Sequence, residues 1–285
     1  MYRHGAAVND AKIILRCLAV VGRSDHYAHF FLDFMMPIYH WLYSHGRLYD
    51  RNLCILIGDP KAEIFRPIMG QFFNCKIVTS GTLEELVSRH RDMIFGWEAH
   101  NRKILGLKLA DYIGFPFQYL NDFHEYLLKQ TGLTAKDKNK FILVRRKHTD
   151  DDRGGGRRNI TNHDEVAEAM EGEASRVGME FVDAMLEDMS FAEQVDLFHN
   201  AAVLVAQHGA ALCNIMFMRP TGVIVELHKN RKEEYRYRQL CDFFNIGRHS
   251  NIVCPLDAKS CSSQGNIIVP VERLSEHVRQ EIQRR

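Results

Sequence analysis

The stretch Val203-Leu-Val-Ala-Gln-His208-Gly-Ala-Ala-Leu212 joins an apolar run to a His-Gly turn and then to a series of small residues. The run predicts a buried parallel strand at 202–206, and the following residues predict a helix at 210–218. His208 then stands at the carboxyl end of the strand, the edge at which open α/β sheets bind ligands. Gly209 and the alanines after it give a phosphate or diphosphate access to the first N–H groups of the helix. A tight turn with a solvated imidazole has the same sequence, so both interpretations stay open.

Strand-like and helix-like segments alternate on both sides of this stretch. The other strands are expected at 13–21, 53–57, 75–79, 93–95, 140–145, 179–182 and 223–227. The other helices are expected at 26–44, 64–73, 99–113, 117–131, 162–176, 190–200, 234–244 and 272–285. Strands separated by helices indicate parallel sheets built from βαβ units, and therefore an α/β fold.

A polar run at 136–140 is the best candidate for a domain boundary. We therefore expect two Rossmann-like domains, residues 1–135 and 136–285, facing each other across a cleft. The last helix is a candidate to pack back on the first domain.

Composition places the chain among globular proteins. Of its 285 residues, 46% are hydrophobic and 26% charged, which excludes a disordered or fibrous chain. The 37 basic and 36 acidic residues leave a net charge of +1, so nothing favours a nucleic-acid or membrane-surface partner. An odd number of cysteines, seven, without a C-x-x-C pair suggests free thiols in a reducing compartment. If Met1 is the native start, the absence of a signal peptide and of an apolar span predicts a soluble intracellular protein.

Charged residues near the strand ends are candidates for nucleotide binding. Glu226 ends the next strand, where a carboxylate can accept hydrogen bonds from a ribose diol, although a charge on the surface looks the same. Arginines at 145, 146, 157 and 158 bracket a loop with three consecutive aspartates and three consecutive glycines. Arginine matches phosphate oxygens in bidentate geometry, and we favour Arg146 and Arg158 over the loop itself.

The segment His26-Tyr-Ala-His29-Phe-Phe-Leu-Asp33 carries the main candidates in the first half. Spacings of three, four and seven place the two histidines and the aspartate on one stripe of an α-helix. Such a stripe suits a metal bound by two histidines and a carboxylate, as in a metal-dependent hydrolase, or a general base. A buried His–Asp pair that ties the helix down is the structural alternative.

An ordered series of motifs resembles glycosyltransferase family 61, which includes xylosyltransferases and O-linked N-acetylglucosamine transferases. It comprises Arg158-x-Ile160-x-Asn162, Ser190-Phe-Ala-Glu-Gln194, His208-Gly-Ala-Ala-Leu-x-Asn214-x-x-Phe217-Met-x-Pro220 and Val223-Ile-Val-Glu226-Leu. His29-Phe-Phe-Leu-Asp33 is similar to the histidine-rich motif of that family. The triple-Asp, triple-Gly loop and the lack of a secretory anchor depart from the family pattern. These departures suggest a virus-encoded or bacterial member.

The resemblance implies a GT-B fold and an inverting transfer that needs neither metal nor cofactor. Arg146 and Arg158 would then hold the diphosphate, together with the helix opening at His208, Gly209 and Ala210. Glu226 would bind the ribose and Asn162 would belong to the nucleotide site. Asp33 or His29 would deprotonate the acceptor hydroxyl, and His26 would lie on the acceptor side.

The expected function is transfer of a sugar from a UDP-sugar to a glycan hydroxyl, with xylose the first choice of sugar. UDP-N-acetylglucosamine is the alternative donor. A non-catalytic protein that binds sugar nucleotides or glycans on the same fold is the alternative from another functional class. The expected partners are a nucleotide sugar and a glycan acceptor, and no motif reports the oligomeric state.

Overall fold

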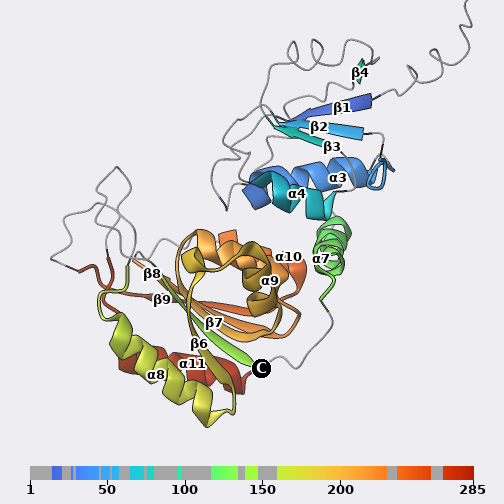
Figure 1. Ribbon diagram of the computed structural model, residues 1–285. Coiled ribbons are helices and arrows are strands. Elements are labelled where there is room, and N and C mark those ends of the chain that lie inside the picture. Colours follow the sequence, from blue (N-terminus) through green and yellow to red (C-terminus); the bar gives the residue numbers. More distant parts are fainter. Residues whose placement is uncertain are drawn as a thin grey trace, which may run out of the picture. The chain divides into compact units, whose positions relative to one another are not determined.

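A computed structural model describes residues 15–20, 27, 30–44, 46–51, 53–57, 65–73, 76–79, 95–97, 117–133, 139–146, 159–229, 236–257 and 266–285. The chain divides into two compact units, Met1–Tyr119 and Leu120–Arg285. Each unit has its own parallel sheet (Figure 1). From the sequence we expected the boundary after residue 135. The difference arises because most of helix α7 (Phe117–Thr131) belongs to the second unit. The ring of Phe123 on α7 packs against Phe244 of the second unit.

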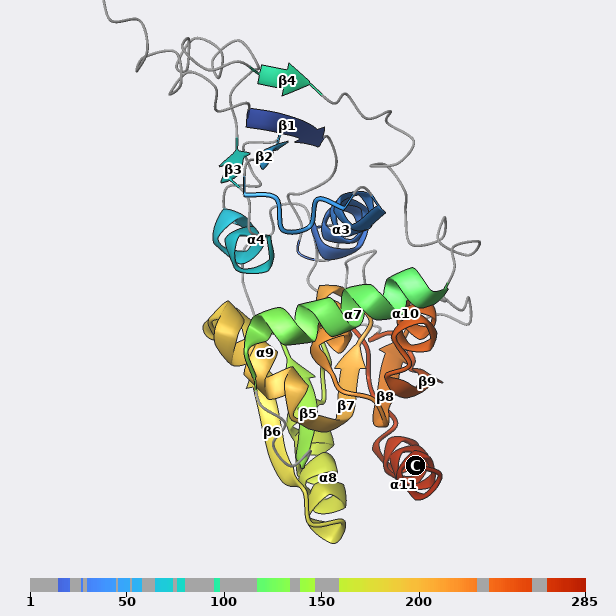
Figure 2. The ribbon, with the colours of Figure 1, turned by 90° about the vertical axis from the view of Figure 1, so that its right-hand side faces the viewer.

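The first unit contains a four-stranded sheet in the order β3-β2-β1-β4. Its strands are β1 (Leu15–Val20), β2 (Leu53–Ile57), β3 (Lys76–Thr79) and β4 (Phe95–Trp97). Helices α3 (Met36–Ser44) and α4 (Arg66–Phe72) lie on the same side of the sheet in Figure 1 and in the rotated view of Figure 2. The chain enters α3 through a π-helix, η1 (Phe30–Met35). The uniform α-helix expected over 26–44 is therefore wrong from Phe30 to Met35. The helix expected at 99–113 lies outside the described residues.

The second unit contains a five-stranded sheet in the order β6-β5-β7-β8-β9. Its strands are β5 (Lys140–Arg145), β6 (Glu180–Met185), β7 (Ala201–Gln207), β8 (Gly222–His228) and β9 (Gly247–Val253). Counted along the chain, this is the 2-1-3-4-5 order of flavodoxin-like sheets. The order reverses between β5 and β7, and such a switch point is where ligands bind in open α/β sheets.

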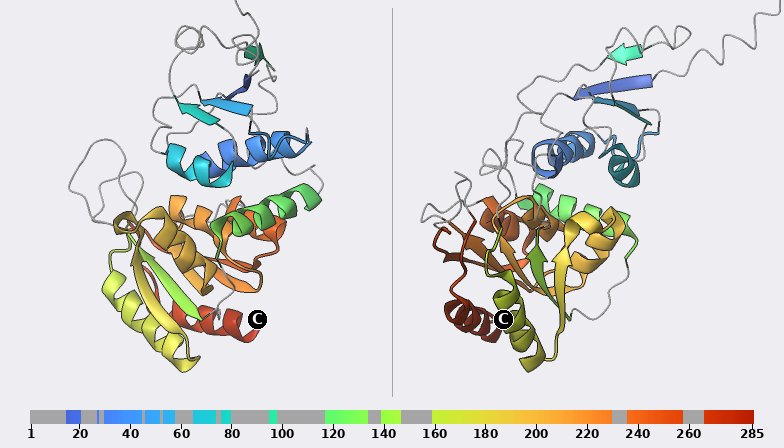
Figure 3. Two further views of the ribbon diagram at one scale, coloured as in Figure 1. Left: turned by 45° about the vertical axis from the view of Figure 1, so that its right-hand side comes forward. Right: turned by 60° about the vertical axis from the view of Figure 1, so that its left-hand side comes forward.

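Helices cover both faces of this second sheet, as the views in Figure 3 show. One face carries α8 (His163–Arg176) and α11 (Val271–Gln283). The other carries α9 (Phe191–His199), the 3-10 helix η5 (Ala210–Phe217) and α10 (Arg236–Phe244). The last helix, a candidate to contact the first domain, packs against α8 of its own unit, where Arg279 hydrogen-bonds to Glu173.

The central strands β5, β7 and β8 are buried on both faces of the sheet because their residues are mostly apolar. Phe141, Val203 and Val223 belong to the core cluster beneath α8 and α11. Since side chains alternate across a strand, the opposite face carries Ile224, Glu226 and His228 of β8. The face covered by α10 therefore contains two buried polar side chains of β8, those of Glu226 and His228. In the described part of the chain, no helix has the length and apolar character needed to cross a membrane.

In the second unit, η5 and β9 also differ from the sequence expectation. The helix expected at 210–218 is a 3-10 helix, and the N–H of Leu212 donates to the carbonyl of Gly209 at 3.0 Å. Strand β9 was not expected at all. It is an edge strand with mostly half-buried or exposed side chains, so it lacks the apolar run that identifies a buried strand.

Buried His124 of α7 gives the second unit an acid-sensitive contact. Its Nε2 donates to the carbonyl of Met218 at 3.0 Å, and its ring stacks on Phe244. Burial lowers the pKa of His124 to about 4, the bond to Met218 opposes this shift, and nearby His199 adds to it. The His124 imidazole therefore stays neutral in the folded protein at pH values at which it already binds a proton in the unfolded chain.

The stability that His124 provides is expected to fall as the pH is lowered from about 6.5 to 4. A shift from 6.5 to about 4 corresponds to about 3 kcal/mol of unfolding free energy by pH 4. Urea unfolding at pH 7 and pH 4.5 should show a smaller loss for His124→Gln, whose amide can still donate to Met218 but cannot be protonated. Equal losses in wild type and variant would contradict this account.

Candidate functional site

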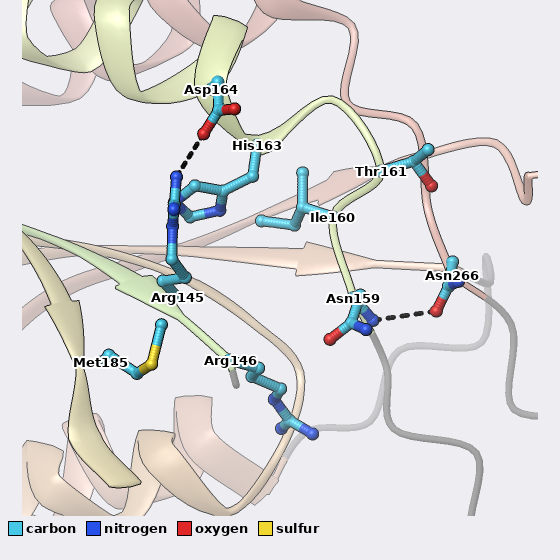
Figure 4. Close-up of a pocket in the computed structure, with 9 residues that line it drawn as sticks. All are labelled: Arg145, Arg146, Asn159, Ile160, Thr161, His163, Asp164, Met185 and Asn266. Carbon is cyan, nitrogen blue, oxygen red and sulfur yellow. Dashed lines mark hydrogen bonds and ion pairs between the residues drawn. The ribbon is translucent and has the colours of Figure 1, made fainter. Parts of the chain in front are cut away.

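The candidate site lies at the carboxyl end of β5, where two consecutive arginines point in opposite directions (Figure 4). Arg145 turns toward α8 and β6, where it forms ion pairs with Asp164 and, at 3.1 Å, with Asp183. Asp183 also accepts a hydrogen bond from His163 at 2.8 Å. Two carboxylates therefore meet the charge of Arg145, whereas Arg146 faces away from them.

Arg146 lies against the backbone of the His-Gly turn that follows β7. A Cβ atom built on Gly209 would be only 1.8 Å from Nη2 of Arg146, so the guanidinium rests where any other side chain would begin. The glycine is thus explained by this close approach, since its backbone is extended. Arg146 and the His208-Gly209 turn come from β5 and β7, the two strands at the switch point.

Hydrogen bonds hold the His208-Gly209 turn in place. The N–H of His208 donates to the carbonyl of Leu227 on β8 at 2.9 Å, and the hydroxyl of Tyr237 on α10 donates to the carbonyl of Gly209 at 2.7 Å. The rings of His228 and Tyr237 contact the His208 ring edge-on, with centroids 4.8 and 5.4 Å away. Strand β8 and helix α10 therefore both help to hold His208 in position.

Glu226 is buried beneath this turn, with its side chain 1% exposed. Its Oε1 accepts a hydrogen bond from Nδ1 of His208, and its Oε2 accepts one from Nε2 of His249 at 2.9 Å. Burial by itself raises the pKa of Glu226, but the hydrogen bonds and charges of His208 and His249 outweigh it and lower the pKa. An ionised carboxylate at this position supports His208 directly.

A pocket of about 340 Å³ opens beside the two arginines (Figure 4). Its lining consists of residues from β5, the end of β6, the start of α8 and the segments before it and before α11: Arg145, Arg146, Asn159, Ile160, Thr161, His163, Asp164, Met185 and Asn266. Asn266 accepts a hydrogen bond from the backbone N–H of Asn159 at 3.1 Å. The far wall thus consists of two segments distant in sequence.

Asn162 joins the two segments that form this wall of the pocket. Its side-chain amide donates to the carbonyl of Val269 and accepts from the N–H of Val269, both at 2.9 Å. These bonds place Asn162 next to the pocket as a residue that joins the two wall segments. The role in nucleotide binding that the resemblance gave it stays a prediction.

The structure brings Arg146, His208, Gly209, Ala210 and Glu226 together around the ends of β5, β7 and β8. Arg158, His26 and His29 lie outside the described residues. Asp33 lies in the π-helix η1, so the α-helical spacing on which the His26-His29-Asp33 stripe depended does not apply to it.

Three of the buried groups around the turn, those of His208, Glu226 and His228, have potential ligand atoms within 4.8 Å of one another. Nδ1 of His208 is hydrogen-bonded to Oε1 of Glu226, and it must carry a proton to donate to the ionised carboxylate. In the arrangement described here, His208 and Glu226 are therefore partners in a hydrogen-bond network.

The sequence also matches a family model described as Glycosyltransferase 61, over residues 27–225. The chain belongs to glycosyltransferase family 61. It is also 27% identical, over 142 residues, to the EGF domain-specific O-linked N-acetylglucosamine transferase of Gallus gallus. The matched part is 47% of this chain and 25% of the relative, so the chain spans about a quarter of that protein's length.

The family 61 match includes Arg146, His208 and Gly209 but ends one residue before Glu226. His249 lies outside the match and was not among the residues expected from the sequence. No local signal marks it, because it sits in an edge strand that was itself not expected. The bond between Tyr237 and Gly209 is likewise visible only in the fold.

Proposed function

We propose that this family 61 protein is an inverting, metal-independent glycosyltransferase that moves a sugar from a UDP-sugar to a glycan hydroxyl. In this proposal the two units form a GT-B arrangement, with the donor on the second unit and the acceptor on the first. Family membership supports the reaction class. The geometry at the switch point supports the place where the donor binds.

The observation that carries the proposal is the position of Arg146 on Gly209. It sets a guanidinium beside the half-buried backbone of Gly209 and Ala210 at the carboxyl edge of the sheet, where a diphosphate would gain both charge and N–H donors. Arg158 would add a second cation. With the leaving diphosphate stabilised by fixed positive charge, the transfer would need no metal ion.

Glu226 is assigned to the donor site chiefly through His208. Both of its oxygens already accept hydrogen bonds, although each has a second lone pair that a ribose hydroxyl could use. The carboxylate is 1% exposed, so a ribose would need to reach it past His208. We therefore place its main contribution in holding His208.

Asp33 or His29 would act as the base that deprotonates the acceptor hydroxyl. π-helical turns are rare and frequently occur at functional sites, which favours Asp33 in η1. The variant Asp33→Asn separates the two candidates. If transfer is lost while UDP binding remains, Asp33 is the base, and if transfer survives, His29 takes that role.

Two donors are to be compared, because the resemblance favoured UDP-xylose whereas the Gallus gallus relative is named for N-acetylglucosamine transfer. Calorimetry with UDP, followed by donor hydrolysis and transfer assays in EDTA, tests the proposal. We expect UDP to bind, and one of the two sugars to be released or transferred without metal. UDP binding without any turnover would indicate a non-catalytic binding protein, and loss of turnover in EDTA would overturn metal independence.

A further inference from the structure

Most of the wall of the pocket beside Arg146 is electrically neutral. The charge of Arg145 is met by Asp164 and, at 3.1 Å, by Asp183. The remaining wall includes residues whose side chains carry no charge: Asn159, Ile160, Thr161, Met185 and Asn266 (Figure 4). This wall therefore suits an uncharged group better than a second phosphate.

Asn159 provides a hydrogen-bond acceptor in this wall. Among the described residues, its side-chain Oδ1 is buried and has no hydrogen-bond partner. Its backbone is held, because the N–H donates to Asn266 at 3.1 Å. Buried oxygens without a partner are rare in proteins because they cost free energy. The χ2 angle of asparagine is soft, so the amide can turn toward the pocket. The oxygen thus indicates a ligand that donates a hydrogen bond.

Among the parts of a UDP-sugar, the sugar fits this wall best. An ionised diphosphate only accepts hydrogen bonds, whereas a sugar carries several hydroxyls that can donate to an amide oxygen. Uridine also has donors, but its base would gain most from an aromatic ring on which to stack. Among the described residues that line the pocket, none carries a Phe, Tyr or Trp ring. Ile160 and Met185 offer apolar contacts to the C–H groups of a sugar ring.

We propose that this pocket receives the sugar of the donor and that Oδ1 of Asn159 accepts a hydrogen bond from it. Arg146 both lines the pocket and lies on Gly209, so a sugar attached to a diphosphate at Arg146 enters the pocket directly. The identity of the ligand rests on the proposed function. The new part is the position of the sugar, on the side of Arg146 where β6 ends and α8 begins.

The first test is Asn159→Ala in the full-length protein, with calorimetry in EDTA against UDP, UDP-xylose and UDP-N-acetylglucosamine. The affinity for the UDP-sugar that wild type prefers should fall about tenfold, because a hydroxyl loses its acceptor. The affinity for UDP should stay within about twofold of wild type. Asn139→Ala is the matched control, since Asn139 is exposed at the opposite end of β5, and it should change neither affinity.

The second test fills the pocket. Met185 is half-buried in the lining, and Met185→Trp places a larger side chain there. This variant should weaken the UDP-sugar more than tenfold and UDP less than about twofold. Arg146→Ala should weaken both ligands by the same factor, because both contain the diphosphate. Urea unfolding shows whether each variant is folded.

The outcomes separate this inference from the proposed function. If Asn159→Ala weakens UDP and the UDP-sugar equally, the pocket binds the nucleotide part, and the sugar assignment is wrong. An unchanged UDP-sugar affinity in Asn159→Ala overturns the role of Asn159, and the same result in Met185→Trp overturns the position of the sugar. If wild type binds neither UDP nor either UDP-sugar, the proposed function itself fails and this inference falls with it.

Discussion

Arg146→Ala is expected to weaken UDP binding about 100-fold while leaving the fold intact. A guanidinium that forms charge-assisted hydrogen bonds to a diphosphate contributes about 2–3 kcal/mol, which corresponds to roughly that factor in affinity. The side chain lies on the backbone of Gly209 rather than in the core, so its removal leaves a gap at the ligand edge. Calorimetry with UDP measures the affinity, and urea unfolding checks the fold.

Arginine variants elsewhere serve as controls for the Arg146 result. Arg145→Ala should weaken UDP binding less than about threefold, because Asp164 and Asp183 already meet that charge. Arg284→Ala removes the same formal charge from the exposed end of α11 and should have no effect. Arg146→Lys should restore part of the affinity, since lysine keeps the charge without the planar fork. If Arg146→Ala bound UDP with the affinity of the wild type, the proposal that the diphosphate binds at this edge of the sheet would be wrong.

Gly247→Ala is expected to lower the free energy of unfolding by at least about 4 kcal/mol. Gly247 has φ +140°, and a Cβ atom there would lie 2.1 Å from the carbonyl oxygen of Gly222. The obstacle is backbone of the paired strand, so β8 and β9 would have to separate at their first pair. Domains are commonly stable by 5–15 kcal/mol, and urea unfolding followed by circular dichroism should reveal a loss of this size.

Two other glycines separate the causes of that loss. Gly178 also has a positive φ, +67°, but a Cβ there meets nothing within 4 Å, so Gly178→Ala should cost only about 1–2 kcal/mol. Gly172 lies within α8 with open space around it, and Gly172→Ala should stabilise the protein by about 0.5–1 kcal/mol. If Gly247→Ala were no worse than Gly178→Ala, the contact with Gly222 would not be limiting.

The sequence predicts those parts of the fold in which local pattern and tertiary packing agree. β5 and α7 have the expected bounds because their apolar residues follow the spacing of a buried strand and of an amphipathic helix. β9 was missed, since its edge position removes the need for an apolar run. The π-helix at Phe30–Met35 was missed because the same apolar residues suit an α-helix equally well.

The residues of the candidate site likewise fall into those that the local sequence predicts and those that depend on contacts between strands. His208 and Gly209 could be placed because a strand, a turn and small residues follow one another directly. The bond between His249 and Glu226 joins residues 23 positions apart on neighbouring strands, and no local spacing reports it. The ion pair between Arg145 and Asp183 likewise joins neighbouring strands, and no local spacing reports it.

The pocket wall also ties the site to the order in which the chain is made. Asn159 and Asn162 obtain their partners, Asn266 and Val269, from a segment 107 residues later. During synthesis the arginines, the His-Gly turn and most of the sheet leave the ribosome before that segment exists. A nascent or prematurely terminated chain that ends before Asn266 therefore lacks one wall of the pocket, even if its sheet has already folded.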